Sequence, residues 1–420
     1  MKTLLISPPF VPVYFNSDYN FVEIGEVAGH LAATSDVALT VRDYSAMNGT
    51  WQDVINDLAS PWDVVLIHNT IENFEAVERM VTLVQLLHAE AVIATYGRLS
   101  RHMTPALERI GVDVIVIEQD WEVPLAMLAR RGRSAMNGDL PGCRIRTGDS
   151  YMAGAAAMHL SDWALPLDSA LPIRAYGYMG RGGGDAVVAG DLGIGMSRGC
   201  DSRCEYCPIP VVNGGTERFR PNVERAADFI YERAATWGLS SASLFAANFT
   251  LDHEYVRRFC AAMIARGGSI GWKCVTSPML LSRELIEVMA SAKCLRVAIG
   301  VESLKTGGQP HYRGRAGAAE LEAVASWCRA AGVRMVGFVM VGIPGQTRED
   351  VRFTLRLLSD NRISPRPMVY TNFRRMAAHE NLRDTFWYAR KATLAAPGEW
   401  TIPELTRIVQ SWRDWMAEMA

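Results

Sequence analysis

Three cysteines lie within eight residues of one another in the stretch SRGCDSRCEYCPIP, residues 197–210. They are Cys200, Cys204 and Cys207, in the spacing C-x3-C-x2-C. In a reducing compartment a disulfide framework is not expected, so crowded thiols indicate a metal site or a catalytic site. A structural zinc site needs four ligands, usually as two separated pairs, and no His or fourth Cys lies near this stretch. Three thiolates suit an iron–sulfur cube better, because they hold three irons and leave the fourth iron open to another ligand.

The rest of the composition narrows the class of protein. The formal net charge of −2 over 420 residues gives no basic footprint for nucleic acid or for an anionic membrane. No uncharged apolar run approaches the ~20 residues that span a bilayer, and MKTLLISPPF reads as a first strand rather than a signal peptide. We therefore expect a cytoplasmic protein that binds neither nucleic acid nor membrane. The remaining five cysteines stand among apolar residues and are expected to be small buried hydrophobes: Cys143, Cys260, Cys274, Cys294 and Cys328.

The cysteine spacing, with the aromatic Tyr206 before the last cysteine, resembles the signature of the radical S-adenosylmethionine (radical SAM) enzymes. The resemblance implies that Cys200, Cys204 and Cys207 bind one [4Fe–4S] cluster, whose open iron is chelated by SAM. It also implies that an electron from the reduced cluster cleaves SAM to methionine and a 5′-deoxyadenosyl radical. A flavodoxin or ferredoxin would supply that electron, and the cofactors would carry the difficult chemistry.

The residues around the cysteines alternate between strand and helix patterns, as a parallel βα fold requires. The strand patterns cover 192–200, 241–252, 270–278, 295–303, 333–347 and, more weakly, 366–373. The helix patterns cover 220–239, 253–268, 282–294, 318–332 and 348–361. We therefore predict a partial (β/α)6 radical SAM barrel over residues 191–360, with the cysteine loop at its C-terminal face. Residues 361–420 are predicted to form a short helical C-terminal extension.

Two strand ends resemble less strict motifs of the same family. VAIGVES, residues 297–303, resembles the fourth-strand element that approaches SAM, and VMVGIPGQT, residues 339–347, resembles the fifth-strand element along the adenine. The resemblance implies that Tyr206 and Ile343 are neighbours of the adenine. Candidate contacts to the methionine or ribose portions of SAM are Asn248, Thr276, Glu302 and Ser303.

The family pattern does not establish which residues of this sequence bind the carboxylate and the amine of the methionine portion of SAM. Arg313 or Arg315 is the candidate partner of the SAM carboxylate, because a guanidinium can bind a carboxylate in bidentate geometry. The usual Gly-Gly-Glu after the second strand is replaced by AAN, residues 246–248. No residue is therefore assigned to the methionine amine.

The first part of the chain forms a separate pattern of five short apolar strands, at 2–10, 37–44, 62–70, 89–97 and 112–120. Helical patterns at 73–89 and 102–111 lie between some of them, which indicates an open doubly wound sheet with ligands at the carboxyl ends of its strands. In order and length, residues 1–140 resemble the cobalamin-binding domain that precedes many radical SAM barrels. Residues 141–190 resemble the linker of those proteins.

Three departures from the cobalamin-domain pattern count against cobalamin binding. The region after the first strand has no Asp-x-His-x-x-Gly, and HNTIEN, residues 68–73, replaces the Ser-x-Leu that receives the nucleotide tail. The Gly-Gly after the fourth strand reads TYG, residues 95–97. A Tyr in that position occupies volume that the tail would need, since only glycine permits such close approach. We assign no ligand role to His68 or His102.

Two kinds of reaction therefore compete. If cobalamin binds, the resemblance implies radical methylation of a carbon atom in natural-product biosynthesis. If it does not, the chain is similar to radical SAM diol dehydratases of aminoglycoside biosynthesis, which remove a hydroxyl from a sugar and use a separate nicotinamide-dependent reductase. The short C-terminal extension favours this second reading, with a small polar molecule as substrate. Candidate acid and base residues near the sugar are Asn16, Asp18, Glu72 and Asp252.

Overall fold

The fold was analysed in a computed structural model of the chain. The structure describes residues 1–9, 18–34, 36–70, 73–97, 100–118, 120–171, 176, 191–202, 204, 206, 207, 209, 215–304, 316–370 and 400–418. These residues divide into two compact units, and the chain passes from the first to the second after residue 180. That point lies within the range 141–190 that the sequence predicts to be a linker.

The first unit is built on a seven-stranded sheet in the order β2-β1-β3-β4-β5-β6-β7. Its first five strands are parallel: β1 Lys2–Ser7, β2 Ala38–Asp43, β3 Val64–Asn69, β4 Val92–Gly97 and β5 Val114–Val116. Residues of β1, β3 and β4 are buried on both faces of the sheet, because helices cover both faces. This order confirms the predicted doubly wound sheet.

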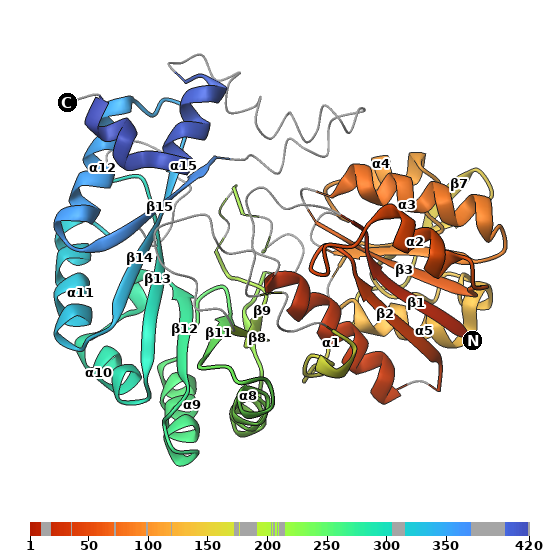
Figure 1. The fold of residues 1–420 in the computed structure, drawn as a ribbon, viewed down its shortest axis with the longest axis horizontal. Coiled ribbons are helices and arrows are strands. Elements are labelled where there is room, and N and C mark those ends of the chain that lie inside the picture. Colours follow the sequence, from red (N-terminus) through yellow and green to blue (C-terminus); the bar gives the residue numbers. More distant parts are fainter. Residues whose placement is uncertain are drawn as a thin grey trace. The chain divides into compact units, whose positions relative to one another are not determined.

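Five α-helices surround that sheet: α1 Asp18–Thr34, α2 Trp51–Leu58, α3 Phe74–Leu87, α4 Thr104–Arg109 and α5 Glu122–Arg131. In Figure 1, α1 and α5 pack together on one face of the sheet, and α2 and α3 pack together on the other face. Thr50 begins α2 with a capping box, since its side chain accepts from the Asp53 amide while the Asp53 carboxylate accepts from Thr50 N. A single 3-10 turn, η1 Gly132–Ala135, follows α5.

An antiparallel hairpin extends the first sheet where the sequence predicts the start of a linker. β6 Cys143–Thr147 pairs with β5, and β7 Ser150–Ala153 pairs with β6. Gly148 supplies the left-handed backbone of the tight turn, with φ +62°. The predicted linker therefore begins with two strands of the first unit, followed by the 3-10 turn η2 Asp168–Ala170.

The second unit contains a six-stranded parallel sheet in the order β15-β14-β13-β12-β11-β8. Its strands are β8 Asp191–Gly195, β11 Ser241–Phe245, β12 Gly271–Thr276, β13 Cys294–Glu302, β14 Arg334–Val341 and β15 Ile363–Val369. All six overlap predicted strand regions, and the order leaves β8 and β15 as the two edges. β15 begins three residues before its predicted range and lies within residues 361–420, so the barrel sheet extends beyond the predicted boundary at residue 360. Figure 1 shows this sheet curving with its helices outside, which confirms a partial barrel.

Five helices connect these strands: α8 Val223–Trp237, α9 His253–Ala265, α10 Arg283–Ser291, α11 Ala318–Ala330 and α12 Arg348–Asp360. Several of these helices begin after residues that favour helix N-termini. The side chains of Asn222, before α8, and of Ser282, before α10, accept hydrogen bonds from backbone amides of the first turn. Gly238 ends α8 in the left-handed conformation, as the sequence predicts. A 3-10 turn, η3 Pro278–Leu280, lies between β12 and α10.

Two further elements surround the barrel strands. A short antiparallel ribbon pairs β9 Ser197–Arg198 with β10 Arg218–Phe219, on either side of the cysteine loop. The C-terminal helix α15 Ile402–Glu418 packs near β15 and buries Trp415, in agreement with the predicted helical extension. Among the described residues, no helix is both long enough and apolar enough to cross a membrane.

In the second unit an aromatic cluster joins α9 to the sheet, and a buried ion pair lies at the amino ends of the strands. Phe249, Phe259 and Trp272 meet edge to face, with ring centroids 5.4 to 5.6 Å apart. At the amino ends of the strands, Lys273 Nζ contacts Asp191 Oδ2, and both side chains are 6% exposed. Ser241 also donates to the Asp191 carboxylate, so this end of the barrel is closed by a hydrogen-bonded charge pair.

Candidate functional site

The cysteine loop follows β9 at the carboxyl end of the barrel strands. Cys200 is buried, and Cys204 and Cys207 are half-buried. The loop turns tightly, because the amide of Cys207 donates to the carbonyl of Cys204 at 3.2 Å. Two N–H groups donate to Cys200 Sγ: the backbone amide of Ser202 at 3.4 Å and Nδ2 of Asn248 at 3.6 Å. Burial raises the pKa of the Cys200 thiol, so a thiolate there needs a nearby positive charge such as iron.

The donor set of this loop fits an iron–sulfur cube. Within the part of the chain that is described, no three His, Cys, Asp or Glu side chains converge as ligands of a single metal ion. In a cube each cysteine binds a different iron, so its three thiolates do not converge on one point. N–H···S hydrogen bonds such as those to Cys200 are a further feature by which proteins adjust the potential of such clusters.

The other five cysteines behave as the sequence predicts. All are buried in strands or helices of the two units. Burial raises the pKa of Cys260 and of Cys328 to about 12, which keeps these thiols protonated and inert at neutral pH.

Tyr206 joins the cysteine loop to the end of β13. Its hydroxyl donates to Glu302 Oε1 at 3.2 Å, and burial raises the pKa of the phenol. Glu302 has φ +61°, where the register between β13 and β14 shifts. A non-glycine residue in this conformation is strained, and such strain concentrates at functional sites. The structure thus brings together two of the residues that the family resemblance selects.

The predicted adenine strand, β14, ends in a loop that one side chain holds in place. Gln346 Oε1 accepts the amides of Gly342 at 2.8 Å and Ile343 at 3.2 Å, and its Nε2 donates to the carbonyl of Met340 at 2.9 Å. Ile343 is only 1% exposed, and its role as a neighbour of the adenine stays a prediction. Gln346 was not among the SAM-site residues predicted from the sequence.

Thr276 and Ser303 lie at the ends of β12 and β13 and are buried. The hydroxyl of Thr276 already bonds that of Thr250 at 2.6 Å, which ties the end of β12 to the segment after β11. Their roles as SAM contacts stay predictions.

Glu217 is the other residue that the sequence analysis missed. It precedes β10, and its carboxylate accepts from the hydroxyl of Ser197 and, at 2.9 Å, from the backbone amide of Asn248. Asn248 Nδ2 lies 3.4 Å from Glu217 Oε2 and 3.6 Å from Cys200 Sγ. The predicted SAM contact Asn248 therefore bridges the cysteine loop and a carboxylate from 31 residues earlier in the chain.

The structure describes the side chain of only one of the four candidate acid and base residues, Asp252. Asn16 and Glu72 lie outside the described residues, as do Arg313 and Arg315. Asp18 begins α1, but its side chain is outside the described part. Asp252 is the N-cap of α9, and its carboxylate accepts the amides of Glu254 and Tyr255 at 3.0 Å each. This placement gives Asp252 a helix-capping role, and its catalytic role stays a prediction.

The carboxyl edge of the first sheet contains a buried aromatic group. The ring of Tyr96 stands 5.3 Å from that of His68 and 5.5 Å from that of Trp121. His68 Nε2 lies 2.8 Å from Glu23 Oε2, which belongs to α1. Gly97 follows with φ +132°, and a Cβ there would lie 2.1 Å from the carbonyl oxygen of Asn69. Only glycine fits this position.

Three buried polar atoms at this edge have no hydrogen-bond partner within the described residues: His68 Nδ1, Tyr96 Oη and Trp121 Nε1. Buried polar atoms are normally satisfied, so such atoms fit the edge of a site for a large polar ligand such as cobalamin. Tyr96, which was predicted to occupy volume that the nucleotide tail would need, is fully buried.

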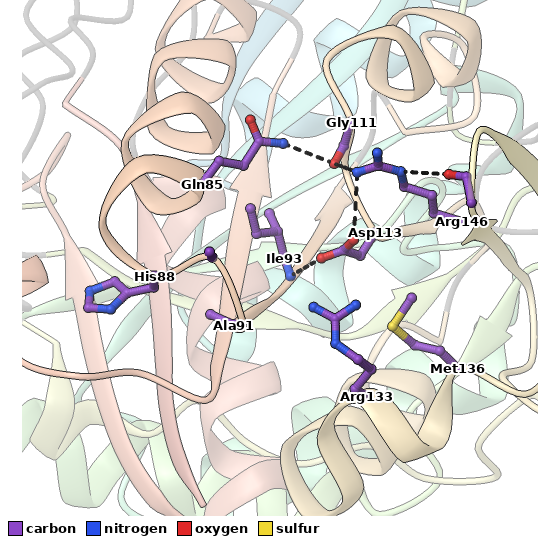
Figure 2. A pocket seen from close by; sticks show the side chains of 11 residues that line it. Gln85, His88, Ala91, Ile93, Gly111, Asp113, Arg133, Met136 and Arg146 are labelled. Carbon is purple, nitrogen blue, oxygen red and sulfur yellow. Dashed lines mark hydrogen bonds and ion pairs between the residues drawn. The ribbon is translucent and has the colours of Figure 1, made fainter.

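Figure 2 shows a cavity of about 310 Å³ at the opposite, amino-terminal end of β4 and β5. Two charged side chains that line it form hydrogen bonds to the backbone. Asp113 Oδ2 accepts a hydrogen bond from the amide of Ile93 at 2.9 Å, and Arg146 donates to the carbonyls of Gly111 and Gly148. Burial raises the pKa of Asp113. These contacts join the ends of strands, so we assign this cavity a structural role.

Comparison with known proteins defines the class of the second unit. Residues 194–358 match the radical SAM superfamily. The ribosomal protein uS12 methylthiotransferase RimO of Moorella thermoacetica is 31% identical to the chain over 185 residues. That similarity covers 40% of this chain, and the chain spans only 41% of the length of this relative. With the cysteine loop, the match identifies a radical SAM domain in this chain.

The solved structures extend the likeness to both units. The radical SAM methyltransferase TsrM from Kitasatospora setae, solved with cobalamin and a [4Fe–4S] cluster, has a TM-score of 0.69 at 17% identity. The likeness covers 88% of this chain and 75% of TsrM. OxsB, a cobalamin-dependent SAM radical enzyme, has a TM-score of 0.67 at 14% identity over 94% of this chain and 56% of that protein. The chain thus shares with both proteins a fold in which a doubly wound domain precedes a partial barrel.

Proposed function

We propose that the chain is a cobalamin-dependent radical SAM methyltransferase that acts on a small molecule. The observation that carries the proposal is the likeness to TsrM, which spans the first unit as well as the barrel. A radical SAM domain alone would leave the reaction open, because this domain serves many chemistries. In this chain, as in TsrM, another domain accompanies the barrel, and this favours a reaction that uses both domains.

The residues of the second unit support the SAM-dependent part of the proposal. Cys200, Cys204 and Cys207 would hold the cluster, and the backbone of residues 342–346, fixed by Gln346, would receive the adenine. When bound, the cluster and SAM supply an electron and a reactive group derived from SAM. The protein holds the reactants in place, and burial around Cys200 and Tyr206 excludes water from them.

The first unit supports the cobalamin part of the proposal. Ligands of doubly wound sheets bind outside the carboxyl ends of the strands. The three unsatisfied atoms of His68, Tyr96 and Trp121 lie near that edge. Cobalamin, when bound there, supplies methyl-transfer chemistry.

The dehydration of an aminoglycoside-type sugar, which the sequence analysis favoured, gains no support from these comparisons. That interpretation depended on missing cobalamin motifs and a short C-terminal extension. A fold shared with TsrM at a TM-score of 0.69 is present despite both features, so the methyl-transfer alternative fits better. A small-molecule substrate and a flavodoxin- or ferredoxin-type electron donor stay predictions.

The test uses the full chain, reconstituted anaerobically with iron and sulfide, with and without hydroxocobalamin. We expect about one corrinoid per chain. With a chemical reductant added, so that the reduced cobalamin can accept the methyl group, we expect up to one equivalent of SAM per chain to be converted to S-adenosylhomocysteine, and only when cobalamin is present. Formation of 5′-deoxyadenosine alone, at the same rate with and without cobalamin, would instead favour a reaction of the dehydratase kind.

A further inference from the structure

Glu217 is a buried carboxylate whose hydrogen-bond partners are all neutral. The residue is 8% exposed and lies beside the carboxyl end of β11. Its donors are the hydroxyl of Ser197, the backbone amide of Asn248 at 2.9 Å and the Asn248 side-chain amide at 3.4 Å. No ion pair of the described residues includes Glu217. Burial raises the pKa of this carboxyl, which means that its charged form lacks a full electrostatic partner.

Two other carboxylates of the second unit, Asp191 and Glu404, have cationic partners. Asp191 contacts Lys273, and Glu404 receives two hydrogen bonds from Arg348 at 2.7 Å each. Burying an unpaired carboxylate costs several kcal/mol, so natural proteins pair such groups or use them. Glu217 differs in this respect from Asp191 and Glu404.

Asn248, which contacts Glu217, also lies beside one of the cluster cysteines. Asn248 Nδ2 lies within reach of both Glu217 Oε2 and Cys200 Sγ. Once iron is bound, Cys200 is a thiolate, so one neutral amide then lies between two groups of negative charge. A cation placed beside Glu217 would offset this repulsion.

We propose that Glu217, together with Asn248, binds the α-ammonium group of SAM. The sequence AAN lacks the acidic residue that usually ends this strand, and the structure brings the carboxylate of Glu217 to the backbone amide of Asn248 itself. An ammonium has three donors and forms charge-assisted bonds to a carboxylate, which neutral partners cannot replace. The inference rests on SAM as a ligand of this domain but not on cobalamin or on methyl transfer.

The same contacts would also allow a purely structural role, in which Glu217 only joins the cysteine loop to β11. The variant Glu217→Gln separates the two roles, because it keeps an acceptor oxygen of the same size and removes the charge. Asp201→Asn is the matched control, since the exposed Asp201 carboxylate accepts the amide of Glu217 at 3.1 Å in the same loop.

The experiment titrates SAM into the reduced, cluster-loaded protein and follows the cluster by electron paramagnetic resonance. We expect Glu217→Gln to keep its iron and sulfide and to bind SAM about 10- to 100-fold more weakly, as for the loss of a charge-assisted hydrogen bond. Asp201→Asn should bind SAM like the wild type. A SAM analogue without the α-amino group should bind the wild type and Glu217→Gln equally.

Four results would overturn the proposal. Wild-type affinity for SAM in Glu217→Gln would show that the charge is not used. An equal loss of affinity for the analogue, or a loss of the cluster itself, would show that Glu217 only supports the loop. A wild-type spectrum that SAM leaves unchanged would refute the SAM site altogether, whereas a failure of methyl transfer with normal SAM binding would refute only the proposed reaction.

Discussion

At the scale of single residues, the eight cysteines separate by their surroundings. Cys200 receives two N–H donors in an irregular loop, whereas Cys143, Cys260 and Cys328 are packed inside strands and helices. Burial alone raises the pKa of Cys143. Spacing in the sequence predicts this division because local spacing decides which thiols can share a cluster.

Replacing Cys204 by Ala is expected to abolish cluster assembly. A cube bound by two cysteines loses one of its three anchored irons, so iron, sulfide and the brown absorption should all fall to background after anaerobic reconstitution. Cys328→Ala is the control, because Cys328 is fully buried in α11 and should leave the iron content at the wild-type level. Full cluster absorption in Cys204→Ala would show that the ligand set is wrong.

The Lys273–Asp191 pair allows a second prediction for single residues. Asp191→Asn leaves a buried ammonium without a counter-charge, which is expected to lower the free energy of unfolding by about 3 to 5 kcal/mol. Glu287→Gln is the control, because the Arg283–Glu287 pair is 73% and 57% exposed and should contribute less than about 1 kcal/mol. Denaturant unfolding of both variants measures the difference. Equal, small losses would show that the buried pair contributes no more than a surface pair.

At the scale of elements, the C-terminal helix supports the loop that ends β14. Trp400, just before α15, donates from Nε1 to the carbonyl of Gln346 at 2.9 Å, and Arg348 binds Glu404 of α15 in bidentate fashion. Gln346 in turn holds the amides of Gly342 and Ile343. The C-terminal extension, which the sequence treats as an appendage, is therefore part of the predicted SAM site.

Trp400→Phe is expected to weaken SAM binding without unfolding the barrel. The change removes one hydrogen bond, worth about 1 kcal/mol, and leaves the Gln346 carbonyl unpaired, so the dissociation constant for SAM should rise about 5-fold. Trp412→Phe makes the same kind of change inside α15, where the ring packs against Arg413, and should leave the affinity unchanged. Equal affinities for SAM in the two variants would mean that α15 does not position the loop.

The sequence predicts the parallel strands of both units because each is an apolar run bounded by turn residues. It misses β6 and β7, in which only Cys143 and Ile145 are buried, and β10, which has two residues. It includes the residues of β9 in the first barrel strand and so misses the pairing of β9 with β10. The same short ribbon explains why Glu217 was missed. No local spacing relates Glu217 to Asn248, and only the pairing of β10 with β9 brings the cysteine loop and Glu217 to the end of β11.

At the scale of the whole molecule, motif departures proved a poor guide to the first unit. The sequence analysis compared a few loop residues with a family pattern and counted Tyr96 against cobalamin. The fold depends on many apolar positions of β1, β3 and β4, which are buried in this chain. Loops at the carboxyl ends of strands can change while the sheet that carries them stays the same.

The last prediction concerns the linkage between cobalamin and the stability of the first unit. A ligand that binds only the folded state stabilises it by RT ln(1 + [L]/Kd), which is about 2.7 kcal/mol at a concentration of 100 times Kd. For a unit of this size that gain should raise the midpoint of thermal unfolding by roughly 5 to 10 °C.

Because the proposed cobalamin edge contains none of the cluster cysteines, hydroxocobalamin should produce the same shift in a Cys200→Ala, Cys204→Ala, Cys207→Ala triple variant that holds no cluster. Adenosine, which shares no corrin ring, serves as the control and should produce no such shift in that variant. Differential scanning calorimetry of the full chain measures the effect, and an unchanged midpoint at saturating hydroxocobalamin would remove cobalamin from the proposed function.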